Sequence, residues 1–426
     1  MRIRLSDPAR FRGRLTRLAV LLLALTSACS TGSHPAPSTL AQVGAARHAE
    51  SPNYALLIDA SSSGSRIHIF EWLPGEANGL PRVEAAPAVR EAGEEAWQLV
   101  VDGGLSDYAA EPELAGESLA PLLEFAQRKL AEAGAAPAAA SLHLKATAGL
   151  RLVSEPARSE IMDDVRATLE ASSFDFRTAE IISGQQEGVY GWISVNYLLG
   201  QLGGGRFPTV GALDLGGAST QITFVPIDFP ESEGAVLELG GTTYRVYSHS
   251  YLGFGQDQAR QAVASPACFP RGYPMAPTGE VGSGDFAACR AAIREFLERP
   301  CAEGDCSLMG VYQPPLYGDF FAFSGYGYIS SFLGLDQNLS LPDLERRATA
   351  YCESDWQQVL TDYPGEGLRK YLPTYCFNAV YVATLLTDGF GFAPDTRRVA
   401  TPRQVQGSEV SWVLGSLLYE LGASAD

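Results

Sequence analysis

The residues with the clearest chemical potential lie in one short stretch, Val210–Phe224. Apolar residues lead into Asp214, Gly216 and Gly217 follow, and apolar residues resume after Gln221. This pattern predicts a strand, a tight turn and a second strand. A carboxylate at a strand end suits a hydrated Mg²⁺ or Ca²⁺, because both ions prefer oxygen ligands. We expect the glycines to adopt positive φ and to bring backbone amides close to a phosphate.

A similar arrangement occurs near residue 60. The apolar run Leu56–Ile58 precedes Asp59, and the small residues Ala60–Ser65 separate it from a second apolar run. The turn offers serine hydroxyls and amides to a phosphate, although many β-rich proteins contain turns of small residues. The repetition at Asp214 favours phosphate binding. Two such turns predict a duplicated fold that holds a phosphate chain between two lobes.

Three further polar residues stand near predicted element ends. Glu187 lies between Gly184 and Gly188 at the start of an apolar stretch with helical spacing. It is either a general base or a charge that interacts with the helix macrodipole. Thr147 follows an alternating strand pattern and is a candidate metal or phosphate contact. Arg151 is either a substrate contact or a salt bridge between lobes, and the residues alone leave both open.

Two aromatic stretches are less specific. Phe320–Tyr328 is either a platform for a nucleobase or a buried strand. Tyr247–Gln256 is rich in aromatic residues and glycine, and we expect it to form a loop near the cleft. His249 within it is interpreted as structural, because no serine–histidine–aspartate arrangement surrounds it.

The first 51 residues differ in composition from the rest. Six arginines and the apolar run Leu18–Leu25 precede Cys29, which predicts an export signal over residues 1–28. The run is shorter than the ~20 residues that a membrane span needs. Cys29 resembles a bacterial lipoprotein processing site, although Thr26 replaces the usual leucine and ordinary cleavage is an alternative. Residues 29–51 are predicted to form a flexible tether.

The remaining chain is long enough for two domains and is acidic. The full sequence has 426 residues, 46% of them hydrophobic and 19% charged, with a net charge of −18. Removal of residues 1–28, with six arginines and one aspartate, changes this charge by −5 to −23. Nucleic acid as a ligand is therefore excluded, because its binding depends on lysines and arginines that neutralise phosphates.

The cysteines other than Cys29 lie in the second half of the chain and predict disulfides if the protein is exported. They are Cys268, Cys289, Cys301, Cys306, Cys352 and Cys376. Of 15 possible connectivities, nearest-neighbour pairing is our hypothesis. Their spacing does not fit a thiolate zinc site.

Five stretches together resemble the conserved regions of the apyrase family, the nucleoside triphosphate diphosphohydrolases. They are Asp59–Arg66, Ala146–Arg151, Gly184–Tyr197, Leu213–Thr223 and Cys376–Leu386. The resemblance spans residues 54–420, and Glu187–Ile193 is its most specific part.

The resemblance implies an α/β fold with two lobes, similar to actin and hexokinase and of the ribonuclease H-like type. The first lobe would contain residues 52–183 and 402–426, and the second residues 184–401 with a disulfide-stapled insertion. The implied reaction is stepwise hydrolysis of nucleoside tri- and diphosphates to the monophosphate with Mg²⁺ or Ca²⁺. We expect an exported bacterial monomer, either a periplasmic or outer-membrane lipoprotein or a secreted protein, in contact with a membrane only through Cys29.

The resemblance also implies individual roles. Glu187 would activate water that Ser219 and Gln221 position, while Asp59 and Asp214 would hold the ion through its waters. The residues that would contact phosphate are Ser62, Ser63, Gly64, Ser65, Thr147, Gly216, Gly217 and Ala218. Tyr328 and Tyr371 resemble the aromatic residues that hold the base.

One residue departs from the family pattern. Ser61 stands where the first phosphate turn usually has glycine. If this position requires positive φ, serine costs about 1–2 kcal/mol or shifts the turn, which would alter the phosphate geometry.

Three other functions are weighed against this one. An exopolyphosphatase-like hydrolase of polyphosphate or guanosine polyphosphates would need a basic channel, which this acidic chain offers little of. A nucleotide-binding lipoprotein without turnover would not need Glu187, Ser219 and Gln221 together. An actin-like filament protein fits poorly with export and disulfides, and fold alone would not separate these functions.

Overall fold

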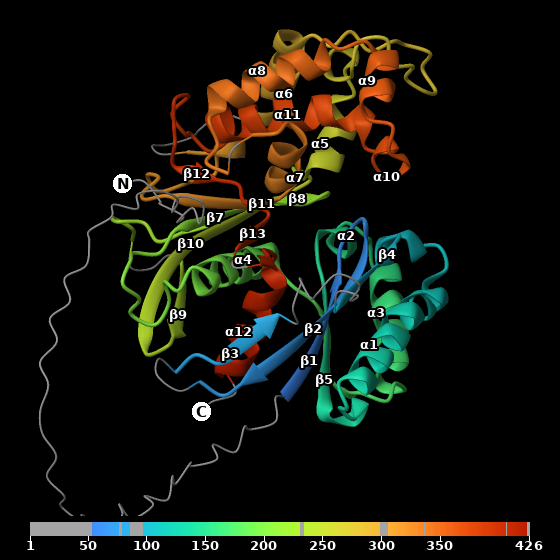
Figure 1. The fold of residues 1–426 in the computed structure, drawn as a ribbon, viewed down its shortest axis with the longest axis vertical. Coiled ribbons are helices and arrows are strands. Elements are labelled where there is room, and N and C mark those ends of the chain that lie inside the picture. The colour runs from blue at the N-terminus through green and yellow to red at the C-terminus, as the bar shows by residue number, and fades with distance from the viewer. Residues whose placement is uncertain are drawn as a thin grey trace, which may run out of the picture. The chain divides into compact units, whose positions relative to one another are not determined.

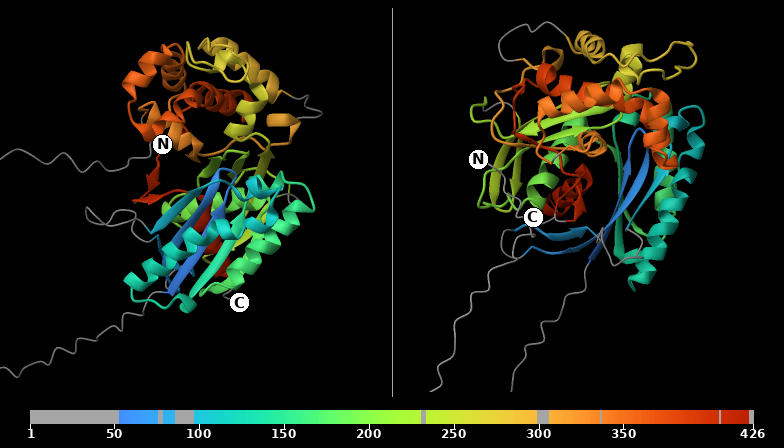
Figure 2. Two further views of the ribbon diagram at one scale, coloured as in Figure 1. Left: turned by 90° about the vertical axis from the view of Figure 1, so that its right-hand side faces the viewer. Right: turned by 45° about the horizontal axis from the view of Figure 1, so that its top comes forward.

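The computed structural model describes residues 53–75, 79–85, 97–230, 234–298, 306–335, 337–405 and 407–423. In this part of the chain, two mixed β-sheets alternate with layers of helices (Figures 1 and 2). None of its helices is long and apolar enough to cross a bilayer. The predicted signal peptide, the tether and Cys29 lie outside the described residues.

The first sheet is built around β1 (Asn53–Ala60), in which Ala55–Ile58 are fully buried. This strand pairs antiparallel with β2 (Gly64–Leu73) and parallel with β5 (Ala140–Ala146). The other strands are β3 (Arg82–Ala85), β4 (Gln98–Asp102) and β6 (Asp175–Ile181). The order is β3-β2-β1-β5-β6, with β4 also paired to β2.

The second sheet repeats this plan. Strand β7 (Gly211–Leu215) pairs antiparallel with β8 (Ser219–Phe224) and parallel with β11 (Phe320–Ser324). The other strands are β9 (Ala235–Leu239), β10 (Thr242–Leu252) and β12 (Val399–Ala400), and the order is β12-β11-β7-β8-β10-β9. The units β1–β2 and β7–β8 therefore occupy equivalent places, each beside a parallel strand, which is the predicted duplication.

Two helices lie between the sheets (Figure 1). Helix α4 (Gly184–Leu198) packs on β7, β8 and β10, while α12 (Trp412–Ala423) packs on α4 and β1. One hydrophobic core joins them to Leu57 of the first sheet and Phe323 of the second. Because both helices are buried on most sides, their sequences are apolar all round rather than along one stripe. The lobe boundaries at residues 183 and 401 stay predictions.

Other helices cover the outer faces of the two sheets. On the first sheet these are α1 (Ala120–Glu132) and α3 (Ala157–Glu170), while the short α2 (Ala148–Arg151) follows the end of β5. On the second they are α5 (Gln256–Val263), α6 (Phe286–Leu297), α7 (Gly325–Phe332), α8 (Leu341–Cys352), α9 (Trp356–Asp362), α10 (Glu366–Arg369) and α11 (Tyr375–Thr384). A π-helical turn, Leu385–Gly389, continues α11, and the hairpin β13 (Gln404–Val405) and β14 (Ser408–Glu409) precedes α12. Short 3₁₀ turns occupy Leu105–Tyr108, Pro112–Leu114, Glu117–Leu119, Pro137–Ala139, Pro266–Cys268, Leu308–Gly310 and Leu372–Thr374.

The described residues contain two disulfides, both in the helical layer on the second sheet. Cys268 pairs with Cys289, and Cys352 pairs with Cys376, as nearest-neighbour pairing predicts. Cys301, half of the third predicted pair, lies outside the described residues. The bond between Cys352 and Cys376 ties α8 to α11, so the second lobe is stapled beyond the predicted insertion.

The predicted loop over Tyr247–Gln256 is wrong. Strand β10 continues to Leu252, and α5 begins at Gln256. The strand was hard to recognise because its inward positions include Ser248 and Ser250. A Cβ atom placed on Gly188 would lie 2.7 Å from the Ser248 hydroxyl, so α4 leaves room only for small side chains there.

Candidate active site

The two predicted phosphate turns lie against each other. A Cβ atom placed on Gly217, in the turn between β7 and β8, would lie only 2.9 Å from the hydroxyl of Ser62 in the turn between β1 and β2. One placed on Gly149, at the start of α2, would lie 2.8 Å from the Ser62 Cα. Ser62 therefore stands between the second turn and α2, and the structure brings the three predicted phosphate-binding segments together.

These turns need glycine because neighbouring atoms leave no room for a side chain, and not because the backbone adopts a left-handed conformation. Neither Gly216 nor Gly217 has positive φ, so that part of the prediction is wrong. Ser61 does not have positive φ either, and its hydroxyl and amide both bond the Gly64 carbonyl, at 2.9 and 3.0 Å. The serine at this position therefore carries no left-handed strain. Gly64 is needed because a Cβ would lie 2.5 Å from the Val101 carbonyl oxygen.

Helix α5 supports the second turn from behind. The amides of Gln256 and Asp257 donate to the carbonyls of Gly216 and Gly217, each at 2.9 Å. The amides of Gly217 and Ala218 donate to no carbonyl among the described residues. Since the turn's carbonyls are already satisfied, its free amides suit phosphate oxygens.

Asp59 and Asp214 stand at equivalent ends of β1 and β7. Each has a buried Oδ1 with no hydrogen-bond partner among the described residues. Burial raises the pKa of Asp59 to about 8, against the opposing effect of Arg66, and raises the pKa of Asp214 to about 7. Glu187 raises both values further, so the three carboxyl groups lie close to one another.

The two aspartates fit a hydrated cation. No group of three histidine, cysteine, aspartate or glutamate side chains able to hold a metal occurs in the described part of the chain. A site made only of protein ligands is therefore not present there. Two carboxylates with unused oxygens instead suit an ion that keeps most of its waters, as Mg²⁺ does.

Ser324 is a member of this site that the sequence did not indicate. It is the last residue of β11 and has φ 53° and ψ −122°, a region that residues other than glycine rarely adopt. Such a conformation costs about 1–3 kcal/mol and persists where the surrounding structure requires it. Here it places the Ser324 side chain to hydrogen-bond Asp214, which partly offsets the effect of burial on the pKa of that aspartate.

Glu187 is fixed at the start of α4. A capping box joins Ser183 and Gln186, and the Glu187 amide continues the helix by donating to the Ser183 carbonyl at 3.0 Å. A Cβ on Gly184 would lie 2.3 Å from the Ser250 hydroxyl. The glycines beside Glu187 thus let the helix approach β10, and Glu187 is 7% exposed.

Polar contacts converge on Glu187 from other elements. Arg151 Nη2 donates to Glu187 Oε2 at 2.8 Å and to the Ser219 hydroxyl at 3.3 Å. Gln221 Nε2 donates to the same hydroxyl at 2.9 Å. Burial raises the pKa of Glu187, and Arg151 opposes that rise through its charge and its hydrogen bond.

The atoms left over define a binding site for one water. Glu187 Oε1 and Gln221 Oε1 have no hydrogen-bond partner among the described residues, so both can accept a proton from water. The Ser219 hydroxyl accepts from Arg151 and Gln221, so its own proton is free to be donated to a water lone pair. One lone pair of that water would remain for attack.

The other predicted phosphate contacts lie in the first turn or at the end of the neighbouring strand. Thr147 is 3% exposed, and its amide donates to the Ala60 carbonyl at 3.1 Å, which links it to the end of β1. The Ser65 hydroxyl is buried with no partner among the described residues. Ser63 lies in the same turn as Ser62 and is exposed.

Tyr328 and Tyr371 are both exposed and lie near Tyr375, whose pKa is raised by burial and, to a smaller extent, by each of them. The Tyr328 hydroxyl donates to Glu409 Oε1 at 3.0 Å, and the Arg403 guanidinium lies 4.9 Å from its ring centre. The stretch Phe320–Tyr328 thus contains both a buried strand and an exposed tyrosine.

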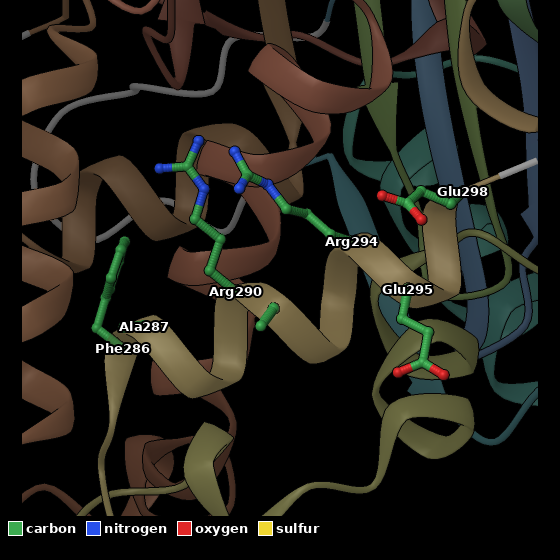
Figure 3. A pocket seen from close by; sticks show the side chains of 7 residues that line it. Phe286, Ala287, Arg290, Arg294, Glu295 and Glu298 are labelled. Atoms are coloured by element: carbon green, nitrogen blue, oxygen red, sulfur yellow. The ribbon is translucent and has the colours of Figure 1, made fainter.

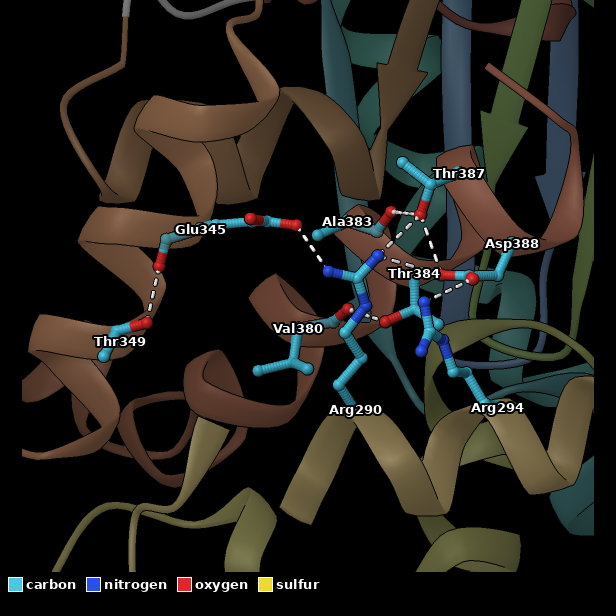
Figure 4. Close-up of polar contacts among 9 residues, drawn as sticks. All are labelled: Arg290, Arg294, Glu345, Thr349, Val380, Ala383, Thr384, Thr387 and Asp388. Carbon is cyan, nitrogen blue, oxygen red and sulfur yellow. Dashed lines mark hydrogen bonds and ion pairs between the residues drawn. The ribbon is translucent and has the colours of Figure 1, made fainter. Parts of the chain in front are cut away.

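A separate hollow of about 480 Å³ lies along α6, where Arg290 and Arg294 project to the same side (Figure 3). Arg290 contacts Glu345 at 2.6 Å and Asp388 at 3.0 Å, and Arg294 contacts Asp388 at 2.7 Å (Figure 4). Both guanidinium groups are therefore engaged in tying α6 to α8 and to the π-helical turn. The hollow contains none of the predicted site residues.

Known proteins are similar to this chain over most of its length. The human ectonucleoside triphosphate diphosphohydrolase 8 is 35% identical over 418 residues, which cover 86% of this chain and 82% of that protein. Probable apyrase 4 of Arabidopsis thaliana is 32% identical over 411 residues, covering 86% of this chain and 79% of its own.

The fold also has a solved counterpart. A nucleoside triphosphate hydrolase of Neospora caninum superposes with a TM-score of 0.59 at 16% identity, over 88% of this chain and 93% of that one. This likeness confirms the predicted two-lobed α/β fold of the actin and hexokinase type. The model of the GDA1/CD39 (nucleoside phosphatase) family matches residues 45–425, and the chain belongs to that family.

Proposed function

We propose that this protein hydrolyses nucleoside tri- and diphosphates to the monophosphate and phosphate, with Mg²⁺ or Ca²⁺ as the metal. The observation that carries the proposal is the water site formed by Glu187, Ser219 and Gln221 beside two phosphate turns that lie against each other. Phosphoryl transfer needs mainly positioning and charge stabilisation, which these groups supply.

In the proposed reaction, the turns at Ser62 and Gly217 hold the phosphate chain between the lobes. The water bound by Ser219 and Gln221 attacks the terminal phosphorus, and Glu187 Oε1 takes its proton as the new P–O bond forms. The bond to the bridging oxygen breaks and releases phosphate and the shortened nucleotide. When bound, a divalent ion near Asp59 and Asp214 would neutralise charge on the phosphates.

The nucleoside end is assigned to Tyr328 and Tyr371. Both rings are exposed, as stacking on a base requires, and both lie close to Tyr375. We also propose that the protein is an exported bacterial monomer, periplasmic, anchored in the outer membrane or secreted, with a lipid on Cys29. The support for export and for the lipid is the composition of the first 29 residues.

The variant Glu187→Gln tests the role of the base. It keeps the size and one acceptor oxygen but cannot take a proton at neutral pH. We expect ATP hydrolysis to fall by about 10²–10⁴-fold, the contribution typical of general base catalysis. ATP binding, measured by calorimetry, should change little, and an equal loss of binding would contradict the assignment.

A further inference from the structure

Arg151 is held at three points inside the site. It is the last residue of α2, and its side chain is 14% exposed. Its Nη1 donates to the Ile182 carbonyl at 2.9 Å, while Nη2 donates to Glu187 and Ser219. The guanidinium therefore spans from the segment that leads into α4 to the first residue of β8.

The contact with Glu187 is made by one carboxylate oxygen. Arg151 engages Oε2 and leaves Oε1 without a partner among the described residues. The other charged groups near Glu187 are the carboxyls of Asp59, at the end of β1, and Asp214, at the end of β7. Arg151 supplies positive charge beside Glu187, as Arg66 does beside Asp59, and it orients the Glu187 oxygen that would accept the proton.

The contact with Ser219 has a separate effect. A serine hydroxyl has one proton and two lone pairs. Because Arg151 and Gln221 donate to this hydroxyl, its proton points away from both of them. Without Arg151, the hydroxyl could rotate and accept a proton from the water instead of donating one.

We propose that Arg151 is a positioning residue for the attacking water: its hydrogen bonds hold Glu187 with Oε1 free and direct the Ser219 proton outward. The inference rests on the proposed function and deepens it. It assigns Arg151 no contact with the phosphates.

The test compares Arg151→Met with Arg151→Lys at saturating ATP and Mg²⁺ over pH 5–9. Removal of the charge should move the acid limb of kcat to higher pH by about 1–3 units, the effect expected of one opposite charge. Arg151→Lys keeps the charge but cannot bridge both partners, so its limb should stay in place while kcat falls at all pH values. KM for ATP should change little in either variant. An unshifted limb in Arg151→Met, or a loss confined to KM, would overturn the proposal.

A second measurement does not depend on activity. Thermal unfolding without nucleotide is compared for Arg151→Met and the double variant Arg151→Met/Glu187→Gln. Without its cation, the buried Glu187 has a folded pKa above the unfolded one, so stability is present at low pH and lost as pH rises through the folded pKa. Arg151→Met should therefore become less stable than the double variant between pH 5 and 8. A constant difference would contradict the coupling, even if the wild-type protein proved to hydrolyse no nucleotide.

Discussion

Buried atoms with no partner define the chemistry at the scale of single residues. Glu187, Ser219 and Gln221 are all nearly inaccessible, yet two acceptors and one hydroxyl proton remain unused among them. Leaving a buried polar atom such as Gln221 Oε1 unpaired costs about 1–3 kcal/mol, so a bound water would stabilise this arrangement. The ion pair between Arg151 and Glu187 fixes which atoms remain available.

Gly217 offers a direct test of how closely the phosphate turns approach. In Gly217→Ala, the new methyl group would meet Asp257 Oδ2 at 2.7 Å and the Ser62 hydroxyl at 2.9 Å. The turns must separate, and a displacement of ~1 Å can reduce activity by about 10²-fold. We expect kcat/KM for ATP to fall by about that factor with a small change in melting temperature.

Gly365→Ala is the matched control, because nothing lies within 4 Å of a Cβ there and its φ is negative. It should retain wild-type activity. If Gly217→Ala also retained it, the turns would not need their close contact for the reaction.

Several site residues could be predicted from the sequence because chemistry and local pattern coincide in them. Asp59 and Asp214 each end an apolar strand, and Glu187 opens a helix between glycines. The contact of Ser324 with Asp214 could not be predicted, because it depends on the positive φ of Ser324 at the end of β11. The contacts of Arg151 could be identified only in the structure, because the sequence pattern is the same for a salt bridge and for a substrate contact.

At the scale of elements, the packing of α12 against α4 fixes the position of Glu187 in the site. Helix α4 holds Glu187, and α12 lies directly against it between the two sheets. The Gly415 amide donates to the Ser194 hydroxyl at 2.6 Å, and a Cβ on Gly415 would lie 1.9 Å from the Tyr190 carbonyl oxygen. The helices cannot approach this closely with any side chain at residue 415.

Gly415→Ala should therefore force α12 away from α4. Overpacking of this kind typically costs about 1–3 kcal/mol, so we expect a lower melting temperature together with reduced kcat. The control is Gly422→Ala in the same helix, where nothing lies within 4 Å of the added Cβ. That change should stabilise by up to ~1 kcal/mol, because alanine favours helix more than glycine does. Equal changes in melting temperature and kcat for Gly415→Ala and Gly422→Ala would contradict the claim that the close contact of α12 with α4 supports the site.

The elements with strong local patterns were predicted well, and those shaped by neighbours were not. Strands β1, β2, β7 and β8 follow from apolar runs that flank small turns. The end of β10 was predicted as a loop because Ser248 and Ser250 replace apolar residues where α4 approaches. The glycines of the second turn were predicted, but for the wrong reason: neighbouring atoms, not positive φ, exclude a side chain.

At the scale of the whole molecule, the acidic chain and its anionic substrate must be reconciled. The net charge of −18 repels nucleotide phosphates, and the buried carboxyls of Asp59, Asp214 and Glu187 add to that repulsion locally whenever they are ionised. Backbone amides and Arg151 offset only part of it. A divalent cation is therefore expected to be essential rather than merely helpful.

The duplicated plan of the two sheets explains why a phosphate chain would fit between them. Each sheet contributes one turn and one aspartate, so a phosphate chain placed between them meets equivalent groups on both sides. This duplication could be predicted from the repeated Asp-turn pattern. The preferred base and the number of phosphates could not, because they depend on exposed side chains such as Tyr328 and Tyr371.

The central claim is metal-dependent hydrolysis of nucleoside tri- and diphosphates, and phosphate release tests it most directly. The purified protein is incubated with ATP, ADP, AMP or linear polyphosphate, each with Mg²⁺ or Ca²⁺ and with EDTA. We predict phosphate from ATP and ADP, none from AMP, and loss of all activity in EDTA that either metal restores. Undiminished release in EDTA, release from polyphosphate alone, or no release from any substrate would contradict the account.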